Sequence, residues 1–519
     1  MRDKKYVYAV SLVVALGGFL MGFDASVISG VNRFIELEFD LSKIELGWAV
    51  ASLTLSSTIA MFIAGPLSDK FSRKRVLSAA AILYTISAIG SALAPSFMFL
   101  VIARMIGGLG VGASLIVAPM YIAEMAPAKN RGSLVSLNQL NIVLGISVAF
   151  FTNYMILQLG KSDLSWVQTL QVDAYNWRWM LGLETVPAVL YFVGLFFVPR
   201  SPRWLIMKGE DEEARAVLNK VNSKEKAQEA FFAVKESFEA EKDQDKRSIL
   251  DLFKPALKLV LLVGVVIGIL QQITGINAVF FYAPMIFEQS GIGTDASFVQ
   301  AILVGLTNLV FTVLAILFID RVGRKPLLIF GLAGIALCMF ILSYEFDKAT
   351  YTLQPETVVE LPEAINQQKI SPMVGVTYEN DLAFKEALES TLGEEVAQSY
   401  ESQLITQATD INATLILIGI IGFVASFAIS IGPVMWVLFS EIFPNYIRGL
   451  AISFVGLINS GVSFGVQLVF PWELANLGSS LTFLIYGVFA AAGLLFIIWV
   501  VPETKGKSLE ELEIYLAKS

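Results

Sequence analysis

The sequence contains no histidine, one cysteine and few charged residues. Without histidine it has no Ser-His-Asp or Cys-His pair, no HExxH zinc site and no imidazole to carry protons near neutral pH. Cys338 is the one cysteine, so an intrachain disulfide is excluded. It lies in an apolar run, and we therefore expect an inert thiol. Charged residues make up 16% of the chain, well below the roughly 25% of soluble domains. The composition therefore argues against a soluble enzyme, and the net charge of −8 argues against nucleic acid as a partner.

Long apolar runs dominate what remains. Hydrophobic residues make up 55% of the 519 residues. That is enough for about twelve membrane spans, since each span needs about 20 apolar residues. Runs of span length begin near Val7, Gly47, Val76, Phe97, Gly132, Trp177, Leu257, Phe298, Pro326, Ile411, Tyr446 and Gly478. The first run has no Ala-x-Ala-like cleavage site, so we expect a retained span and not a signal peptide.

The basic residues of the short loops predict the orientation of the chain. The ten on one side are Lys70, Arg73, Lys74, Arg75, Lys129, Arg131, Arg321, Arg324, Lys325 and Arg448, and the four on the other are Arg33, Lys43, Lys161 and Arg178. Cytoplasmic loops carry the excess of positive charge. An even number of spans puts both chain ends on one side. We therefore expect a multi-pass protein of the cell (inner) membrane with both termini cytoplasmic.

Two hydrophilic blocks interrupt the spans and suggest the domain boundaries. We predict an N-terminal six-helix half (1–199), a cytoplasmic linker of short surface helices (200–255), a C-terminal six-helix half (256–501) and a cytoplasmic tail (502–519). An extracytoplasmic acidic insertion, about 346–410, interrupts the second half, and its stretch 381–400 has helical spacing. Between Asp347 and Asp410 there are twelve acidic and three basic residues, a net charge of −9. This insertion therefore accounts for the acidity of the whole chain.

The two halves are an internal repeat. Asp69, Arg73 and Lys74 recur as Asp320, Arg324 and Lys325, all at an offset of 251 residues, and Glu124, Arg131 and Gly132 recur as Glu441, Arg448 and Gly449, all at an offset of 317. The offsets differ by 66 residues, which the acidic insertion accounts for. Two parallel six-span halves with a site between them near the membrane midplane form a secondary-transporter architecture.

Several motifs carry a resemblance to a known family. They are Gly65 to Lys74, Asp320 to Lys325, Pro119 to Glu124 with Arg131 and Gly132, Gln271 to Asn277, Gly432 to Trp436, Ser440 to Pro444, and Val501 to Gly506. With them the chain resembles the sugar porter family of the major facilitator superfamily, and most closely its bacterial xylose-type proton symporters. The resemblance runs from about residue 8 to 515, except for the acidic insertion. It implies an all-α membrane protein of the major facilitator fold, with twelve transmembrane helices in two six-helix halves and cytoplasmic linker helices.

Three amides form a candidate sugar-binding cluster. Gln271, Gln272 and Asn277 lie in an otherwise apolar run, and each amide can both donate to and accept from a sugar hydroxyl. Gly275 lies between them, where a helix could open. The alternative is that these amides only join neighbouring helices. The resemblance also implies sugar contacts from Gln139, Asn308 and Asn459, with Trp436 as an aromatic floor and Tyr282 as an outer gate.

Asp24 and Arg104 are charged residues inside predicted spans. A charge within a span costs roughly 2.5–3.5 kcal/mol on insertion scales, so such residues are usually functional or paired. The resemblance implies that Asp24 is a proton acceptor paired with Arg104. Protonation of Asp24 would then release Arg104 and change the preferred conformation. The alternative is a structural ion pair that does not titrate.

Charged residues at the cytoplasmic ends of the spans are a candidate latch. They are Asp69, Arg73, Glu124 and Arg131 in the first half and Asp320, Arg324, Glu441 and Arg448 in the second. The resemblance implies ion pairs that hold the inner face closed in the outward-open state and break on inward opening. The alternative is a solvated charged rim that only sets topology.

Four positions depart from the family pattern. Arg200 replaces the acidic member of the motif after span six, Phe281 replaces the first of two tyrosines, and Ser460 follows Asn459 where a tryptophan is common. Ile146 stands where the xylose symporter has a second glutamine and hexose facilitators have an apolar residue. These changes weaken the case for xylose and leave a hexose open.

Taken together, these features predict a secondary active transporter that imports a monosaccharide by proton symport through alternating access. We expect a hexose or pentose, the proton and the lipid bilayer as partners, no cofactor or metal, and function as a monomer. One alternative is an uncoupled facilitative uniporter. Another is a sugar sensor that binds without transport, although only 17 residues follow Pro502. We do not expect an enzyme.

Overall fold

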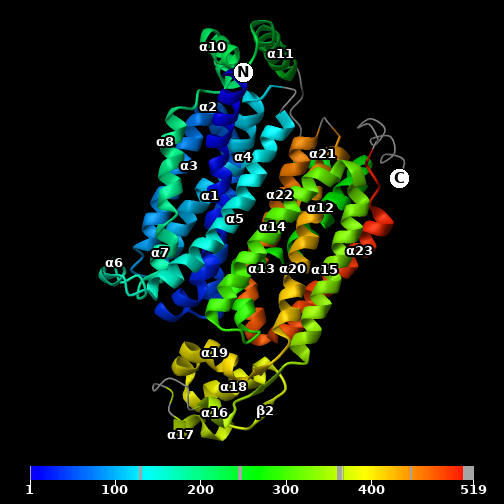
Figure 1. Ribbon diagram of the computed structural model, residues 1–519. Helices are drawn as coiled ribbons and strands as arrows, with labels where there is room; N and C mark the ends of the chain where they lie inside the picture. The colour runs from blue at the N-terminus through cyan, green and yellow to red at the C-terminus, as the bar shows by residue number, and fades with distance from the viewer. Residues whose placement is uncertain are drawn as a thin grey trace. The chain divides into compact units, whose positions relative to one another are not determined.

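The computed structural model describes residues 2–127, 131–242, 248–358, 365, 367–444 and 447–505. Within them, 12 helical segments are long and apolar enough to cross a membrane, as predicted (Figure 1). They are Lys5–Glu38, Lys43–Phe71, Arg73–Ala92, Phe97–Met125, Leu134–Gly160, Asn176–Phe196, Lys258–Glu288, Thr294–Val322, Arg324–Asp347, Ala413–Ile442, Arg448–Asn476 and Gly478–Val500. The predicted starts agree with these to within four residues, the largest differences being Gly47 against Lys43 and Phe298 against Thr294.

The helices of the first half and the linker follow one another with short connections. They are α1 (Arg2–Glu38), α2 (Lys43–Phe71), α3 (Arg73–Ala92), α4 (Phe97–Met125), α5 (Arg131–Gly160), α6 (Ser165–Thr169), α7 (Asn176–Gly182), α8 (Thr185–Phe196), α9 (Pro202–Met207), α10 (Asp211–Val221) and α11 (Lys224–Lys242). Two 3₁₀ segments, Ile249–Phe253 and Pro255–Leu257, precede the next span. The predicted linker helices thus correspond to α9, α10 and α11.

The second half has the same number of spans and one large insertion. Its helices are α12 (Lys258–Ile273), α13 (Ile276–Glu288), α14 (Thr294–Val322), α15 (Arg324–Asp347), α20 (Ala413–Ile429), α21 (Ile431–Ile442), α22 (Arg448–Asn476) and α23 (Gly478–Val500). Three of the twelve spans are broken in the middle, namely α7–α8, α12–α13 and α20–α21. Breaks inside a span are tolerated where the freed backbone is buried in protein or lines a cavity. They therefore mark candidate functional positions.

The chain forms two compact units, whose bounds do not follow the sequence halves strictly. Unit 1 contains residues 1–28, 52–152 and 162–248, and unit 2 contains residues 29–51, 153–161 and 249–519. The end of α1, the start of α2 and the end of α5 therefore pack with the second half of the chain.

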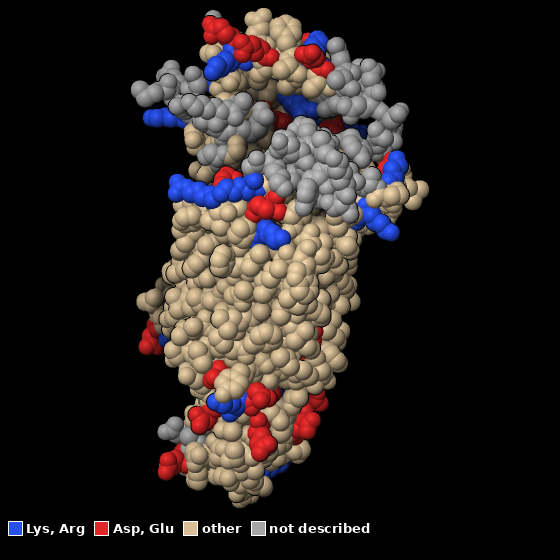
Figure 2. Space-filling model, turned by 90° about the vertical axis from the view of Figure 1, so that its right-hand side faces the viewer, with Lys and Arg blue, Asp and Glu red and all other residues tan. Residues whose placement is uncertain are grey.

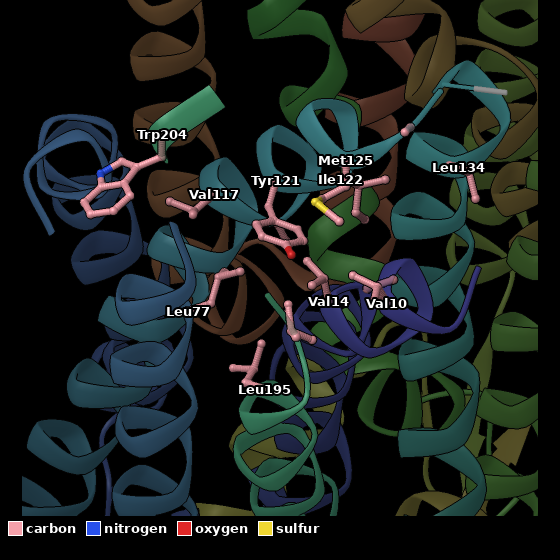
Figure 3. Close-up of a cluster of buried hydrophobic side chains, with 14 of the residues drawn as sticks. Val10, Val14, Leu77, Val117, Tyr121, Ile122, Met125, Leu134, Leu195 and Trp204 are labelled. Carbon is pink, nitrogen blue, oxygen red and sulfur yellow. The ribbon is translucent and has the colours of Figure 1, made fainter. Parts of the chain in front are cut away.

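A buried apolar cluster joins the membrane helices of unit 1 to the linker helices (Figure 3). The ring of Tyr121 lies among side chains of α1, α3, α4 and α8, and α5 and α9 add Leu134 and Trp204. Residues 214, 217, 218 and 221 of α10 are buried against the same cluster, at the spacing of one helix face. The N-terminal end of α1 lies near α10 and α11 in Figure 1.

The acidic insertion, 346–410, is a small folded body with its own core. It contains β1 (Thr350–Thr352), α16 (Pro355–Val358), α17 (Gln367–Ile370), a 3₁₀ turn Ser371–Met373, β2 (Thr377–Tyr378), α18 (Asp381–Leu392), α19 (Glu394–Ala408) and β3 (Thr409–Asp410). The antiparallel strands have the order β2-β1-β3. Tyr351 of β1 is stacked on Phe384 of α18 with ring centroids 5.5 Å apart.

The stretch 381–400 is helical, as its spacing predicted. It is divided into two helices, because Gly393 has φ of +87°, a conformation that ends α18 and starts α19. The three-stranded sheet was not predicted, since its strands are two or three residues long and pair across 25 residues or more. In Figure 1 the helices of the insertion lie beyond the ends of α13 and α20.

Charged side chains are concentrated toward the ends of the helices. On the face in Figure 2, Lys, Arg, Asp and Glu gather at the two ends and leave a broad band without charge between them. Burying such a surface in hydrocarbon costs little, because the main-chain groups are bonded inside each helix.

Candidate functional site

Four amide side chains of α12, α13 and α22 form one hydrogen-bonded network in unit 2. Asn459 of α22 donates to Gln271 Oε1 at 2.8 Å, and Gln272 donates to Asn459 Oδ1 at 3.2 Å. Asn277 of α13 donates to Gln272 Oε1 at 2.7 Å. The structure thus brings together the three amides of the Gln271–Asn277 run and Asn459, which only the family resemblance had indicated.

The network continues along α22 to residues that the sequence analysis did not single out. Asn277 Nδ2 and Gln467 Nε2 both donate to Ser463 Oγ, at 2.6 and 2.8 Å. The hydroxyl of Tyr282 donates to the carbonyl of Gln467 at 2.8 Å. Ser463 and Gln467 follow Asn459 by four and eight residues, so they lie on one face of α22. This spacing of polar residues within an apolar helix was the signal that could have found them.

The helix break at Gly275 shapes this network. Gly275 has φ of +92° and separates α12 from α13, so Gln271 and Gln272 end one helix and Asn277 begins the next. A Cβ at this position would lie 2.7 Å from Cδ2 of Tyr486. Tyr282 also has non-helical backbone angles, two residues before Pro284. Glycine is therefore required both by the backbone conformation and by the close approach of α23.

The other predicted sugar contacts lie outside this bonded network. Asn308 is buried on α14. Trp436 on α21 is 44% exposed and makes an edge contact with Phe439, with ring centroids 5.9 Å apart. Gln139 is exposed on α5 and belongs to unit 1.

Chemically, the network offers a polyhydroxylated ligand both donors and acceptors in an otherwise apolar setting. The amides are held in place by bonds to one another and to main-chain carbonyls, such as that from Gln271 Nε2 to Gly432 O at 3.2 Å. A ligand with several hydroxyl groups could exchange these bonds one for one, since each hydroxyl also donates and accepts. An apolar ligand could not, because it would leave these buried amides without hydrogen-bond partners.

Unit 1 contains a buried ion pair between Asp24 of α1 and Arg104 of α4. Arg104 Nη1 lies 3.3 Å from Asp24 Oδ1, and each side chain is 2% exposed. Asp24 Oδ2 has no hydrogen-bond partner among the described residues. The close approach depends on Gly107, because a Cβ there would lie 2.9 Å from Asp24 Oδ2.

Glu184 is a second buried carboxylate beside this pair. It lies at the break between α7 and α8, is 2% exposed, and interacts electrostatically with both Asp24 and Arg104. Its Oε1 has no hydrogen-bond partner within the described part of the chain. Glu184 was not predicted, although a lone acidic residue inside an apolar run is the same signal that identified Asp24. The site therefore places two buried carboxylates near one buried guanidinium.

The predicted latch residues of unit 1 form a compact cluster around Arg73. Arg73 bridges Asp69 Oδ1, 2.6 Å from Nη1, and Glu124 Oε1, 2.9 Å from Nη2. Ser201 donates to the other oxygen of Glu124. Arg131 begins α5, and its side chain lies outside the described residues.

Unit 2 repeats this arrangement around Arg324. Its Nη2 lies 2.9 Å from Asp320 Oδ1 and 2.8 Å from Glu441 Oε1. Thr504 donates to Glu441 Oε2 at 2.6 Å, the counterpart of Ser201 in unit 1. Arg448 donates from Nε to the carbonyl of Phe443 at 3.0 Å. The internal repeat therefore extends from the sequence to the bonding pattern.

Arg200, which replaces the usual acidic residue of the motif after span six, forms ion pairs with acidic residues of the linker. Its Nη2 lies 2.6 Å from Glu213 and its Nη1 lies 3.1 Å from Glu210, so it ties the end of span six to α10. The equivalent residue in unit 2, Glu503, accepts from the backbone nitrogens of Arg324 and Lys325 at the start of α15. Phe281 is buried and its carbonyl accepts from Asn32 at 2.7 Å, whereas Ser460 is half-buried on α22.

Comparisons with known proteins agree with this geometry. The model of the family described as "Sugar (and other) transporter" matches residues 10–358 and 397–516. The chain is 34% identical to the arabinose-proton symporter of Bacillus subtilis (strain 168), over 98% of this chain and 94% of the relative. It is 35% identical to the D-xylose-proton symporter of Escherichia coli (strain K12), over 98% and 96% of the two chains. The solved structure of the E. coli xylose transporter in an inward-open conformation is similar, with a TM-score of 0.75 at 33% identity, over 98% of this chain and 100% of that one.

These matches confirm the predicted family and the predicted fold of twelve membrane helices. The family model leaves out residues 359–396, so part of the acidic insertion is an addition to the common fold. The network of amides, the buried ion pair and the repeated charge clusters all lie within the matched residues. The chain belongs to the Sugar (and other) transporter family.

Proposed function

We propose that this protein imports a monosaccharide by proton symport, through alternating access, across the cell membrane. The buried Asp24–Arg104 pair carries this proposal. In a chain without histidine a carboxylate is the natural candidate to carry a proton, and a carboxylate inside the membrane is usually functional or paired. The names of the two relatives, an arabinose-proton symporter and a xylose-proton symporter, support the same activity.

Proton coupling follows from the change in charge at the pair. A proton on Asp24 removes the negative charge 3.3 Å from Arg104, so the ion pair becomes a weaker contact between a neutral carboxyl group and the guanidinium. The conformation that gives Arg104 a new partner is then favoured, which makes the pair a two-state switch. Because α1 carries Asp24 and its far end packs with unit 2, movement of α1 would transmit the switch between the halves.

Sugar binding is assigned to the amide network and its neighbours. Gln271, Gln272, Asn277 and Asn459 would exchange their mutual hydrogen bonds for bonds to sugar hydroxyls. Asn308 and Gln139 would add further amide contacts, and Trp436 would cover the C–H face of the ring. Tyr282 would close the site from the outside, since its hydroxyl already bonds to α22 at Gln467.

The charge clusters and the ends of the chain complete the transport cycle. We assign residues 1–199 and 256–501 to the two moving halves, with both termini and the linker 200–255 in the cytoplasm and the insertion 346–410 outside. The clusters around Arg73 and Arg324 would stabilise the closed inner face and separate on inward opening. Most of the predicted tail (502–519), namely residues 506–519, lies outside the described part of the chain. One chain contains both halves, so we expect a functional monomer.

The class of sugar remains a hexose or a pentose. The relatives named above are named for pentoses, whereas Ile146 leaves an apolar residue where the xylose-type pattern has a glutamine. Stabilisation by a ligand grows with its concentration relative to the Kd. A thermal-shift series of monosaccharides on the purified protein would therefore identify the sugar.

Uptake into proteoliposomes tests the proposal. We expect labelled monosaccharide to accumulate when the outside is made acidic, and to leak out when a protonophore is added. Uptake that ignores an imposed pH gradient would instead indicate an uncoupled uniporter. Binding without counterflow would indicate a sensor. Both outcomes contradict proton symport.

A further inference from the structure

A charged cavity lies between the acidic insertion and the ends of the neighbouring membrane helices, all within unit 2. It measures about 150 Å³. Residues of α1, α2, α13 and α22 line one side, and residues of α18 and α19 line the other. Three basic and five acidic side chains face it. Most of the basic ones are engaged in ion pairs that join different elements.

Glu401 of α19 is the residue through which the insertion meets this cluster. Lys385 Nζ of α18 lies 3.1 Å from Glu401 Oε1, and the amide of Gln289 at the end of α13 donates to the same carboxylate. Lys43, the first residue of α2, also interacts with it electrostatically. Burial is the largest single influence and would raise the pKa of Glu401. The charges of Lys385 and Lys43 and the hydrogen bonds from Lys385 and Gln289 together outweigh it, and the pKa falls to about 2.

The ends of α1 and α2 are held in the same cluster. Lys43 Nζ lies 2.6 Å from Glu36 Oε1, which joins α2 to α1. Arg33 of α1 lies 3.1 Å from Glu288 Oε1 of α13 and donates to Thr294 of α14 at 2.6 Å. The two contacts of Arg33 connect α1, in the first half of the sequence, to α13 and α14 in the second half.

The insertion itself is fixed to the second half of the chain. Asp381, at the start of α18, accepts hydrogen bonds from the backbone nitrogen and the hydroxyl of Ser479, both at 3.0 Å. Ser479 lies in the first turn of α23. The core of α18, α19 and β1 makes the insertion a body that moves with these helices.

We propose that the acidic insertion is a lid over the outer face, and that its Glu401 cluster holds the ends of α1 and α2 closed against the second half. The proposal of a lid rests on the proposed alternating-access function, because the outer face could open only if Glu401 separated from Lys43. Residues 359–396, which include α17 and α18, lie outside the family match, so this part of the lid is an addition to the common transporter fold, whereas Glu401 lies within the matched residues.

Hydrogen exchange of the full-length protein in lipid nanodiscs tests the lid without sugar or a proton gradient. Glu401→Gln removes the negative charge that interacts with Lys43. Lys43→Met removes the positive charge of the same interaction. Glu395→Gln is the matched control, because Glu395 is exposed on the same helix. We expect each of the first two changes to speed amide exchange in residues 29–38 by about two- to fivefold, the range expected for partly exposed ion pairs. Lys43→Met also removes the ion pair with Glu36, so the double variant should differ little from Lys43→Met alone in residues 29–38.

The same exchange levels in Glu401→Gln as in Glu395→Gln would overturn the proposal. So would faster exchange confined to α18 and α19, since that would indicate only a loosened insertion. If Glu401→Gln unfolds the insertion, the comparison of Lys43→Met with Glu36→Gln decides, because Glu36→Gln breaks only the pair between α1 and α2 and neither residue is part of the insertion core. Equal exchange in these two variants would overturn the proposal. The readout needs no transport, so failure of the proposed symport would leave these results unchanged and would be seen separately in the uptake assay.

Discussion

At the scale of single residues, the backbone at the start of α3 is strained, whereas glycine relieves the strain at the equivalent start of α15. Ser72 has φ of +93° and ψ of 148°, a region in which residues other than glycine are rare. The residue at the same place in the second half is Gly323, with φ of +106°. Ser72 offsets part of this cost by capping α3, where its side chain accepts from Arg75 N at 3.4 Å.

We predict that Ser72→Gly stabilises the protein. Relief of the backbone conformation should contribute about 1–3 kcal/mol, and loss of the long cap bond should cost only a few tenths of a kcal/mol. The thermal unfolding midpoint should rise. Ser78→Gly, in the interior of the same helix, is the control and should lower the midpoint. A lower midpoint for both variants would show that the cap outweighs the strain.

The residue scale also shows what sequence reasoning could and could not reach. Asp24 and Arg104 were predicted to be functional or paired because a charged residue within a membrane span is costly. Glu184 is also a charged residue within a span. It lies 160 residues after Asp24 in the sequence, however, and no local sequence pattern predicts that the two interact in the fold. Arg200 was correctly noted as a departure, yet its new partners on α10 could only be seen in the fold.

At the scale of elements, the break between α12 and α13 positions the amide network. Gly275→Ala should destabilise the protein by about 2 kcal/mol or more, because it combines an unfavourable φ with a clash against Tyr486. It should also weaken sugar binding in a thermal-shift titration. Gly461→Ala is the matched control, since a Cβ there meets nothing within 4 Å on helix α22. Equal effects of the two changes would argue against a specific role for the break.

The acidic insertion should show a defined pH dependence at Glu401. Its folded pKa of about 2 lies below the value of roughly 4.3 in an unfolded chain. Its stabilising contribution is therefore complete above about pH 4.3 and is lost as the pH falls toward 2. The difference in thermal midpoint between the wild type and Glu401→Gln should be equal at pH 7.5 and 5.5 and should shrink at pH 3.5. A difference that changes between pH 7.5 and 5.5 would contradict this assignment.

The elements differ in how far they follow from local sequence. The twelve spans were predicted because hydrophobic length is a local property. The sheet of the insertion was not, because Tyr351 pairs with both Tyr378 and Thr409 through strands too short to show alternation. The break at Gly393 was also missed, although a glycine within a helical pattern is the usual sign of a helix end.

At the scale of the whole molecule, the internal repeat is the feature that most connects sequence to function. The same arginine bridges two carboxylates in both halves, at Arg73 and at Arg324, and a hydroxyl supports the second carboxylate each time. The repeat was readable from residue offsets alone. The two halves are not equivalent in their buried charges, however, since the Asp24–Arg104 pair with Glu184 belongs to unit 1 and the amide network belongs to unit 2. We infer that the first half carries the proton and the second half carries most of the sugar contacts.

The most direct test of proton coupling compares the wild type with Asp24→Asn in proteoliposomes, measuring both sugar counterflow and accumulation driven by an imposed pH gradient. Asp295→Asn, at an exposed aspartate, is the control. Symport through Asp24 predicts that Asp24→Asn retains counterflow but loses accumulation, while the control retains both. Accumulation by Asp24→Asn that still collapses with a protonophore would contradict the account.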